Sequence, residues 1–135
     1  MREALRDPSR LKHMVESIHN VNQYMEDRVE SDLAENSMLF FAVVKNIEIV
    51  GEAAYKLTHE FKEAHPQTPW RQIIAMRHIL VHGYYQVTPS EIFNVYENDL
   101  PILLNQLTGY LKEVSDICGS INGYGKKIEG NGCGH

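Results

Sequence analysis

Apolar residues recur every three or four positions along most of the chain, which is the spacing of one face of an α-helix. Four stretches show this spacing: from about Pro8 to Asp27, from Phe40 to Leu57, from Pro69 to about His82, and from Pro89 onward. Their apolar stripes are, in chain order, Leu11, Met14, Val15, Ile18 and Met25; Phe40, Val43, Val44, Ile47, Val50, Ala54 and Leu57; Trp70, Ile73, Ile74, Leu80 and Val81; and Ile92, Tyr96, Leu100, Leu103, Leu107, Leu111 and Val114. No alternating strand pattern competes with them, so the sequence predicts an all-α protein.

Capping residues predict where these helices begin. Asp7-Pro8 and Thr68-Pro69 each offer an N-cap side chain followed by proline at the first helical position. Thr58 is placed to cap a short extra turn through Phe61. Thr88-Pro89-Ser90-Glu91 is a capping box, in which the threonine and the glutamate each accept from the other's backbone N–H.

Glycine and proline predict where the helices are interrupted. Gly51 lies inside the second stretch, where glycine costs about 1 kcal/mol relative to alanine, so we expect another helix to approach closely there. Gly83 is suited to a left-handed C-terminal cap, which would leave Tyr84 and Tyr85 just beyond the third helix. Pro101 should kink the fourth helix because its ring clashes with the preceding turn.

Length and composition fit one domain. The chain has 135 residues, of which 43% are hydrophobic, enough for one core. Six of the nine glycines fall from Gly119 onward. We therefore predict one helical domain over residues 1–116, followed by a flexible glycine-rich tail at residues 117–135.

Charge and hydropathy exclude several classes of protein. The net charge of −5 argues against a protein whose whole surface binds nucleic acid, although a local basic site is compatible with it. No apolar run approaches the roughly 18 residues of a membrane span, and the N-terminus shows no signal-peptide pattern, so we expect a cytoplasmic protein. Cys118 and Cys133 have no zinc-site or disulfide-framework spacing and are expected to be free thiols.

The candidate chemistry lies in the segment Arg77-His78-Ile79-Leu80-Val81-His82-Gly83-Tyr84. Arg77 projects from the middle of the third apolar stripe, so it does not lie on a solvated face. RNA can be cut without a metal if one group deprotonates the 2′-hydroxyl, another protonates the leaving oxygen and a cation stabilises the phosphorane. Arginine matches a phosphate with a fixed fork of donors, and histidine transfers protons near neutral pH. Arg77 is therefore the candidate phosphate ligand and His82 the candidate general acid/base.

His78 lies four residues before His82 and hence on the same side of the helix. Either histidine could serve alone, and a two-fold dimer could supply acid and base from identical residues. Two structural alternatives remain open. Arg77 could bridge a carboxylate on a neighbouring helix, and the two histidines could be metal ligands, although no third ligand is evident nearby.

These residues resemble the HEPN superfamily, in particular the HepT-like toxins of prokaryotic HEPN/MNT toxin-antitoxin pairs. Arg77, His82 and Tyr84 match its Arg-x4-His-x-Tyr motif. Three further segments are similar to the family's Ile-Gly-Glu-Ala segment, Pro-Trp helix start and Leu-Pro step: Ile49 to Ala54, Thr68-Pro69-Trp70 and Leu100-Pro101. The position after the arginine, often asparagine in close relatives, is His78 here, and Val50 replaces the usual isoleucine.

The resemblance implies an up-down antiparallel bundle of four main helices. The bundle would form a homodimer whose two motifs meet in a cleft and cut RNA without a metal or cofactor. It also implies a partner, a nucleotidyltransferase antitoxin of the MNT type as in type VII-like systems. That partner would transfer AMP from ATP to the motif tyrosine, by position Tyr84. AMPylation would place bulk and negative charge in the phosphate site and neutralise the toxin.

Three hypotheses about function follow. The first is the toxin ribonuclease, with Arg77 binding phosphate, His82 as acid/base, His78 assisting and Tyr84 as the modified residue. The second is a non-catalytic module that binds a nucleotide or a partner, which the acidic net charge favours because it weakens the grip on RNA. The third is a purely structural dimer, for which removal of Arg77 would dissociate or unfold the protein.

Overall fold

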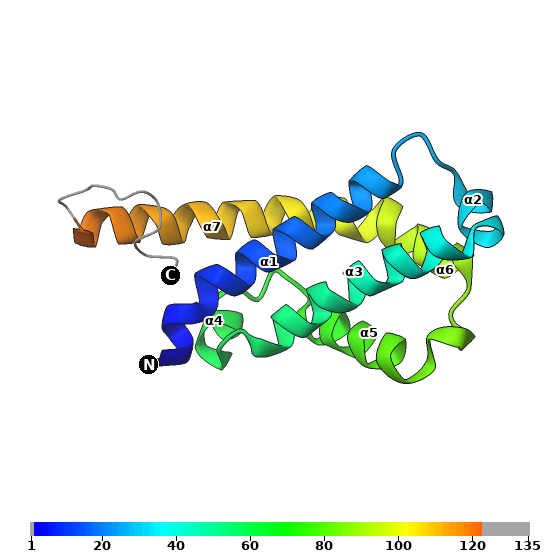
Figure 1. Cartoon of the computed structure of the whole chain (residues 1–135). Helices are drawn as coiled ribbons and strands as arrows, with labels where there is room; N and C mark the ends of the chain where they lie inside the picture. The colour runs from blue at the N-terminus through cyan, green and yellow to red at the C-terminus, as the bar shows by residue number, and fades with distance from the viewer. Residues whose placement is uncertain (1, 123–135) are drawn as a thin grey trace.

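The computed structural model describes residues 2–122, with side chains between residues 6 and 114. In chain order its elements are α1 (Arg2–Tyr24), α2 (Glu30–Glu35), α3 (Ser37–Lys56), α4 (His59–Ala64), α5 (Trp70–Gly83), the 3₁₀ turn η1 (Tyr84–Gln86), α6 (Pro89–Asn94), the π-helical turn η2 (Val95–Asp99) and α7 (Leu100–Asn122). The long helices α1, α3, α5 and α7 alternate in direction, with α1 and α5 running to the right in Figure 1 and α3 and α7 to the left. The predicted all-α antiparallel bundle of four main helices is confirmed.

The core is formed where the apolar stripes meet. α3 lies between α1 and α5 and packs on both, and α7 packs against α1. Leu11, Met14, Ile18, Val43 and Leu107 are fully buried at these contacts. Each such side chain contributes about 1.5–3 kcal/mol through burial, so the long helices are held mainly by this shared interior.

The C-terminal tail predicted at residues 117–135 falls largely outside the described residues. α7 itself continues to Asn122. Residues 123–135, which include Cys133, are not part of the description.

The predicted N-cap role of Asp7 is wrong. α1 begins at Arg2, so Asp7 and Pro8 lie inside the helix. The Asp7 side chain is buried, and its two oxygens accept from the backbone N–H and the hydroxyl of Thr58, at 3.0 and 2.7 Å. The carboxylate is hydrogen-bonded to a residue 51 positions away and so connects α1 to the start of α4.

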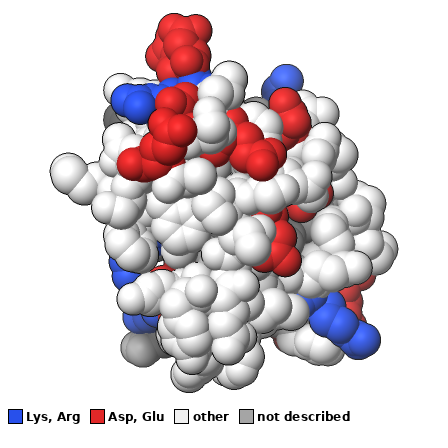
Figure 2. Space-filling view, turned by 90° about the vertical axis from the view of Figure 1, so that its right-hand side faces the viewer, with Lys and Arg blue, Asp and Glu red and all other residues white. Residues whose placement is uncertain are grey.

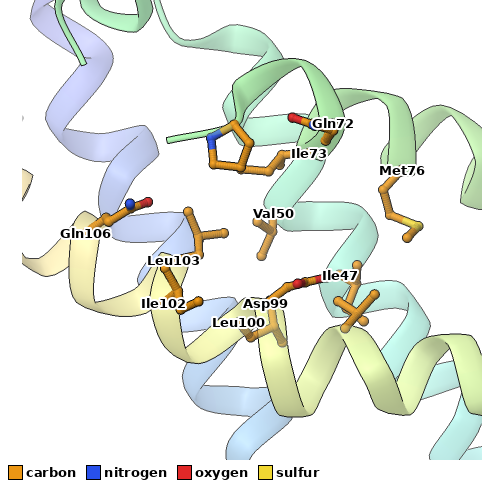
Figure 3. Close-up of a pocket in the computed structure, with 12 residues that line it drawn as sticks. Ile47, Val50, Gln72, Ile73, Met76, Asp99, Leu100, Ile102, Leu103 and Gln106 are labelled. Atoms are coloured by element: carbon orange, nitrogen blue, oxygen red, sulfur yellow. The ribbon is translucent and has the colours of Figure 1, made fainter. Parts of the chain in front are cut away.

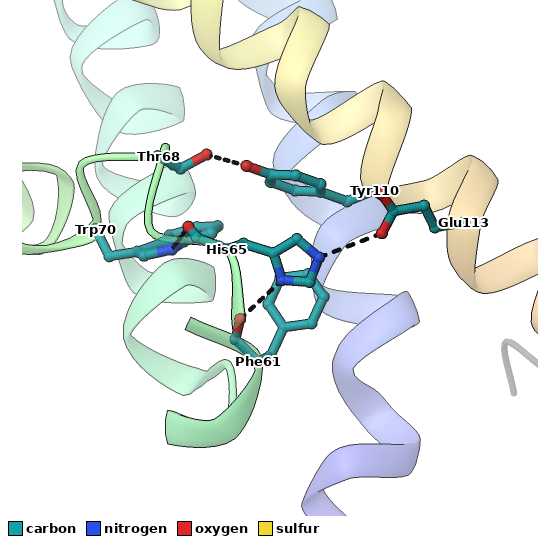
Figure 4. Close-up of polar contacts among 6 residues, drawn as sticks. All are labelled: Phe61, His65, Thr68, Trp70, Tyr110 and Glu113. Carbon is teal, nitrogen blue, oxygen red and sulfur yellow. Dashed lines mark hydrogen bonds and ion pairs between the residues drawn. The ribbon is translucent and has the colours of Figure 1, made fainter. Parts of the chain in front are cut away.

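Thr68 is also not the N-cap that its sequence suggests. Its hydroxyl donates to Gln106 Oε1 of α7 at 2.7 Å and lies against the hydroxyl of Tyr110 (Figure 4). The N-cap position before α5 is occupied by Pro69, without a side-chain cap. A tertiary contact to α7 has therefore replaced the local one.

Two local caps behave as predicted. The Thr58 hydroxyl accepts from the Phe61 N–H at 3.2 Å and begins α4. In the capping box at α6, Glu91 donates its backbone N–H to the Thr88 hydroxyl at 3.1 Å, and Thr88 donates its own to Glu91 Oε1 at 2.8 Å. Both groups need partners only three residues away, so the local sequence is sufficient to specify them.

The predicted left-handed cap at Gly83 is wrong. Its φ is −155° and its ψ is 40°, and the next residue, Tyr84, is right-handed helical. The chain therefore leaves α5 through the 3₁₀ turn η1, closed by a bond from the Val87 N–H to the Tyr84 carbonyl at 3.1 Å. Tyr84 and Tyr85 do lie beyond α5, but in a helical turn.

The break expected at Pro101 takes the form of the π turn η2. Proline has no N–H for the carbonyl four residues earlier, and its ring crowds that carbonyl. In the turn before it, the Leu100 N–H bonds to the Val95 carbonyl, five residues back. A wider turn thus separates α6 from α7.

Candidate functional site

Arg77 lies on the face of α5 that packs against α3. Its side chain is 27% exposed, and its Nε lies 2.7 Å from Glu52 Oε1. The N–H is not aimed at that oxygen closely enough for a hydrogen bond, so the contact is an ion pair. The guanidinium carbon also lies 5.7 Å from the centre of the Tyr55 ring, within cation–π range. The guanidinium is therefore held by two residues of α3.

Gly51 explains why Arg77 comes so close to α3. A Cβ atom at residue 51 would overlap the Cβ of Arg77 and lie 3.0 Å from the carbonyl oxygen of Ile73. The close helix approach predicted at Gly51 is confirmed, and α5 is the approaching helix. Because Glu52 follows directly, the contact that needs glycine also brings a carboxylate to the arginine.

Sequence reasoning did not assign a role to Glu52, although it noted the segment that contains it. An acidic residue beside a glycine in a helix interior was the available signal. Its meaning depended on the alignment of α5 with α3, which periodicity alone does not give.

His78 and His82 form a second, outward row on α5. Their ring centres are 4.5 Å apart, and both residues are exposed. Tyr85, three residues beyond His82 in η1, continues this row and is 76% exposed. The two imidazoles that were predicted to be neighbours are therefore neighbours, and both are open to solvent.

Tyr84 ends the row on the α3 side of α5, which begins with Arg77 and passes through Val81. Its ring lies 5.6 Å from that of Phe41 in α3 and 5.9 Å from that of Tyr85, and the residue is 39% exposed. An aromatic group from two elements of the fold, α3 and η1, thus lies at the C-terminal end of α5.

A surface hollow of about 370 Å³ lies between α3 and α5, directly beside this aromatic group. We call it the α3–α5 hollow; it is lined by Phe41, Val44, Lys45, Glu48, Leu80, Val81 and Tyr84. A second hollow of about 290 Å³ lies on the other side of Tyr84, toward α2 and α6.

Figure 2 shows the end of the bundle at which α2, α6 and the start of α3 lie. Uncharged side chains cover the middle of this face, and acidic side chains gather along its upper part. The exposed acidic residues of α2 and the turn before it are Glu26, Asp27, Glu30 and Glu35. The acidic upper part of this face would repel phosphate, and its uncharged middle offers no cation to bind it.

A third cavity, of about 360 Å³, lies between α3, α5, η2 and α7 (Figure 3). Ile47, Val50 and Leu103 supply its apolar wall, and Gln72, Asp99 and Gln106 are its polar lining residues. None of the candidate site residues lines it, so it is separate from the row of Arg77 and the row of His82.

Between the described residues, no group of three or more histidine, cysteine, aspartate or glutamate side chains is arranged to hold a metal ion. In the same range, no helix has the length and apolar character needed to cross a membrane.

Comparison with known proteins places these residues in a family. The family described as "Ribonuclease HepT-like" matches residues 14–109, a range that contains Glu52, Arg77, His78, His82 and Tyr84. A Thermococcus cleftensis protein named "Probable ribonuclease HepT" is 30% identical over 93 residues, which is 69% of this chain and 84% of that protein.

A longer relative, from Methanocaldococcus jannaschii, is named "Gamma-glutamylcyclotransferase and putative RNase". It is 34% identical over 104 residues, or 77% of this chain, but the match spans only 47% of that protein. No solved structure matches the chain. With the family match covering most of the bundle, the chain belongs to the HepT-like family of HEPN ribonucleases.

Proposed function

We propose that this protein is a metal-independent endoribonuclease, the toxin of a type VII-like HEPN/MNT pair, acting on RNA in the cytoplasm. The observation that carries the proposal is the division of α5 into two rows. Arg77 is anchored by α3 on one row, and His78 and His82 are exposed on the next. A cation held in place and accessible imidazoles are the groups that metal-free RNA cleavage requires.

Arg77 binds the scissile phosphate in this proposal. Glu52 engages Nε on one edge of the guanidinium, so the Nη groups on the other edge present their N–H donors to phosphate oxygens. Glu52 is thus a positioning residue. Its carboxylate fixes the orientation of Arg77, and its charge keeps phosphate on the Nη side.

His82 transfers the proton. As a base it takes the proton of the 2′-hydroxyl; O2′ then attacks phosphorus, and the bond to the 5′-oxygen breaks. A second imidazole protonates that leaving oxygen, which gives a 2′,3′-cyclic phosphate and a 5′-hydroxyl. His78, 4.5 Å from His82 between ring centres, assists.

A homodimer would bring these groups together. Five residues along an α-helix correspond to a rotation of about 140°, so Arg77 and His82 of one chain project in different directions. Arg77 faces α3, whereas His82 is exposed. A two-fold axis beside α5 would bring the His82 of a second copy toward this arginine and provide one imidazole for each proton transfer. Exposed Ile79 supplies apolar surface for that contact.

Tyr84 is the proposed control point. Its position in η1 leaves it 39% exposed at the end of the row that begins with Arg77. An MNT-type nucleotidyltransferase antitoxin would join the tyrosine oxygen to the α-phosphorus of ATP and release pyrophosphate. The attached phosphate would compete for Arg77, and the adenosine would block the approach of RNA.

The test is cleavage of a mixed-sequence RNA in chelator by the purified chain. The parent should cut, and Arg77→Ala and His82→Ala should lose roughly 10²-fold or more. His19→Ala is the matched control, because His19 is also exposed but lies on α1. If the two site variants cut as fast as the parent, the mechanism is wrong. Binding of nucleotide or antitoxin by a parent that does not cut RNA would support a non-catalytic module.

Intact mass after co-expression with the antitoxin tests the regulatory part. One or more AMP groups should map to Tyr84 and be absent from Tyr84→Phe. Modification of Tyr85 alone would contradict this assignment.

A further inference from the structure

The α3–α5 hollow has the walls of a site for a flat, neutral ring. Phe41 and Tyr84 stand at one end with their ring planes inclined by 57°. Val44, Leu80 and Val81 supply an apolar floor. Both aromatic residues are partly exposed, at 50% and 39%, so neither ring is completely covered by other side chains. Aromatic rings open to solvent are the usual platform for unpaired bases.

The position of the hollow fits a nucleotide whose phosphate is bound at Arg77. Val81, in the floor, is one helical turn beyond Arg77, which is about 6 Å along the axis of α5. On α3, Glu48 of the hollow is likewise one turn from Glu52. A base in the hollow and its phosphate at Arg77 would therefore occupy adjacent turns of the same helix pair.

Charge in the hollow selects the part of the nucleotide that can enter. Glu48 and Lys45 lie on its α3 side, with Lys45 Nζ 3.5 Å from Glu48 Oε2. The Glu48 side chain is 27% exposed and that of Lys45 is 65% exposed, so the carboxylate is the more enclosed of the two. A carboxylate repels phosphate but accepts hydrogen bonds from a neutral base. Guanine is the base that offers two adjacent N–H donors, N1–H and N2–H, to one carboxylate.

We propose that the α3–α5 hollow binds an unpaired guanine of the RNA substrate, with Phe41 and Tyr84 contacting its ring and Glu48 accepting from its Watson–Crick edge. The inference rests on the proposed ribonuclease function and specifies the substrate as single-stranded RNA with a guanine beside the cut. It also gives Glu48 and Phe41 a role in specificity that is separate from the proton transfers of the histidines.

Binding of short 2′-O-methyl oligonucleotides tests the site without cleavage, because they lack the attacking hydroxyl. The probes carry guanine, adenine, cytosine, uracil or no base at one central position of an otherwise uridine strand. Fluorescence anisotropy of the full chain should show the tightest binding for guanine. Removing one good bidentate contact should weaken binding roughly tenfold, so Glu48→Gln should lose about that much for guanine and nothing for the abasic strand.

The sign of this effect separates recognition from general electrostatics. Removing a negative charge should strengthen RNA binding if charge alone matters. Glu63→Gln, on the exposed His59–Glu63 pair of α4, is the matched control and should show only that weak strengthening. Phe41→Ala should weaken binding of every base roughly tenfold but not of the abasic strand, whereas Tyr24→Ala should not. Equal losses for guanine and abasic strands in these variants would overturn the site.

A second copy of the chain is the competing occupant. If Phe41→Ala shifts the sedimentation coefficient of the RNA-free protein, the hollow is an interface and the proposal fails. Failure of the ribonuclease function is distinguishable from failure of this site: base-dependent binding without cleavage contradicts the former, and cleavage without base-dependent binding contradicts the latter.

Discussion

Similar side chains lie at the two ends of α5, but those at its start are largely buried and those at its C-terminal end are exposed to solvent. At its start, Thr68 and Tyr110 are buried against each other, and His65 is only 15% exposed. This α5-start cluster is drawn in Figure 4 and consists of Phe61, His65, Thr68, Trp70, Tyr110 and Glu113. At the other end, His78, His82 and Tyr85 project into solvent. Residue type alone therefore does not distinguish a structural side chain from a candidate catalytic one. The presence of hydrogen-bond partners within the protein does.

The hydrogen bonds of the α5-start cluster show what a structural histidine looks like. His65 Nδ1 lies 2.8 Å from the Phe61 carbonyl oxygen, and Nε2 lies 3.3 Å from Glu113 Oε1. The indole of Trp70 donates to the His65 carbonyl at 2.9 Å. Both ring nitrogens of this histidine have protein partners, so it is suited to joining α4 to α7. A histidine that must exchange protons with a substrate needs an accessible nitrogen.

The largest expected effect contrasts the two histidines directly. His82→Ala should lower the cleavage rate roughly 10²–10⁴-fold and leave the thermal midpoint unchanged, because the ring is exposed. His65→Ala should lower the free energy of unfolding by about 1–3 kcal/mol and keep the cleavage rate at temperatures where the protein is folded. Thermal melts beside single-turnover cleavage give both values. Loss of cleavage in a folded His65→Ala protein would contradict the structural role of His65.

The next effect concerns the α3–α5 contact that holds Arg77. Gly51→Ala should destabilise the bundle by about 1–3 kcal/mol, because the added methyl meets the backbone of α5 as well as the Arg77 side chain. Gly109→Ala is the matched control: nothing lies within 4 Å of its added methyl, and alanine should stabilise α7 by up to about 1 kcal/mol. Urea unfolding compares them. Equal effects of the same sign would mean that α5 is not held as described.

A smaller effect is expected at Glu52. The pair with Arg77 is partly exposed, with side chains 27% and 39% accessible, so its loss should cost well under about 1 kcal/mol of stability after solvent screening. Glu52→Gln should instead raise the KM for RNA several-fold with a smaller change in kcat, since the arginine loses its orientation. Glu52→Asp should restore part of the loss. A kcat-only effect would exclude a positioning role in phosphate binding.

The smallest effect lies in the last turn of α4. Burial lowers the pKa of Lys62, and nearby Asp7 opposes this shift by raising it. The unfolded chain therefore binds more protons than the folded one between the lowered pKa and the ordinary value of 10.5, so stability from this residue rises with pH through that window. Lys62→Met should remove the rise. Urea midpoints across mildly alkaline pH would show it, and a rise that persists in Lys62→Met must come from another group.

Local signals in the sequence predicted the local structure, and long-range partners account for most errors. Thr58 and the Thr88 capping box bond within three residues, and both were predicted. Asp7 and Thr68 offered the same chemistry, yet their partners lie 51 and about 40 residues away. The short helix α2 carried too few apolar positions to be recognised. Only the packing of other helices could have revealed these differences.

For the candidate site too, the sequence predicted local features but not long-range partners. The stripe that contains Arg77 indicated that this residue faces inward, and the structure places it against α3. Its partner Glu52 could not be chosen by periodicity, because α3 has a second acidic residue, Glu48, one helical turn earlier. The roles of Arg77, His78, His82 and Tyr84 remain predictions, since they depend on RNA and on further chains.

The π turn η2 also sets the rotation of α7. The buried positions on either side of it are Ile92, Val95, Leu100, Leu103 and Leu107. Their spacing is three, five, three and four, and the interval of five falls across η2. A regular α-helix would have turned Leu100 about 140° away from Val95. The π turn thus acts as a one-residue insertion that the helix absorbs, so that α6 and α7 present one continuous buried face despite the extra residue.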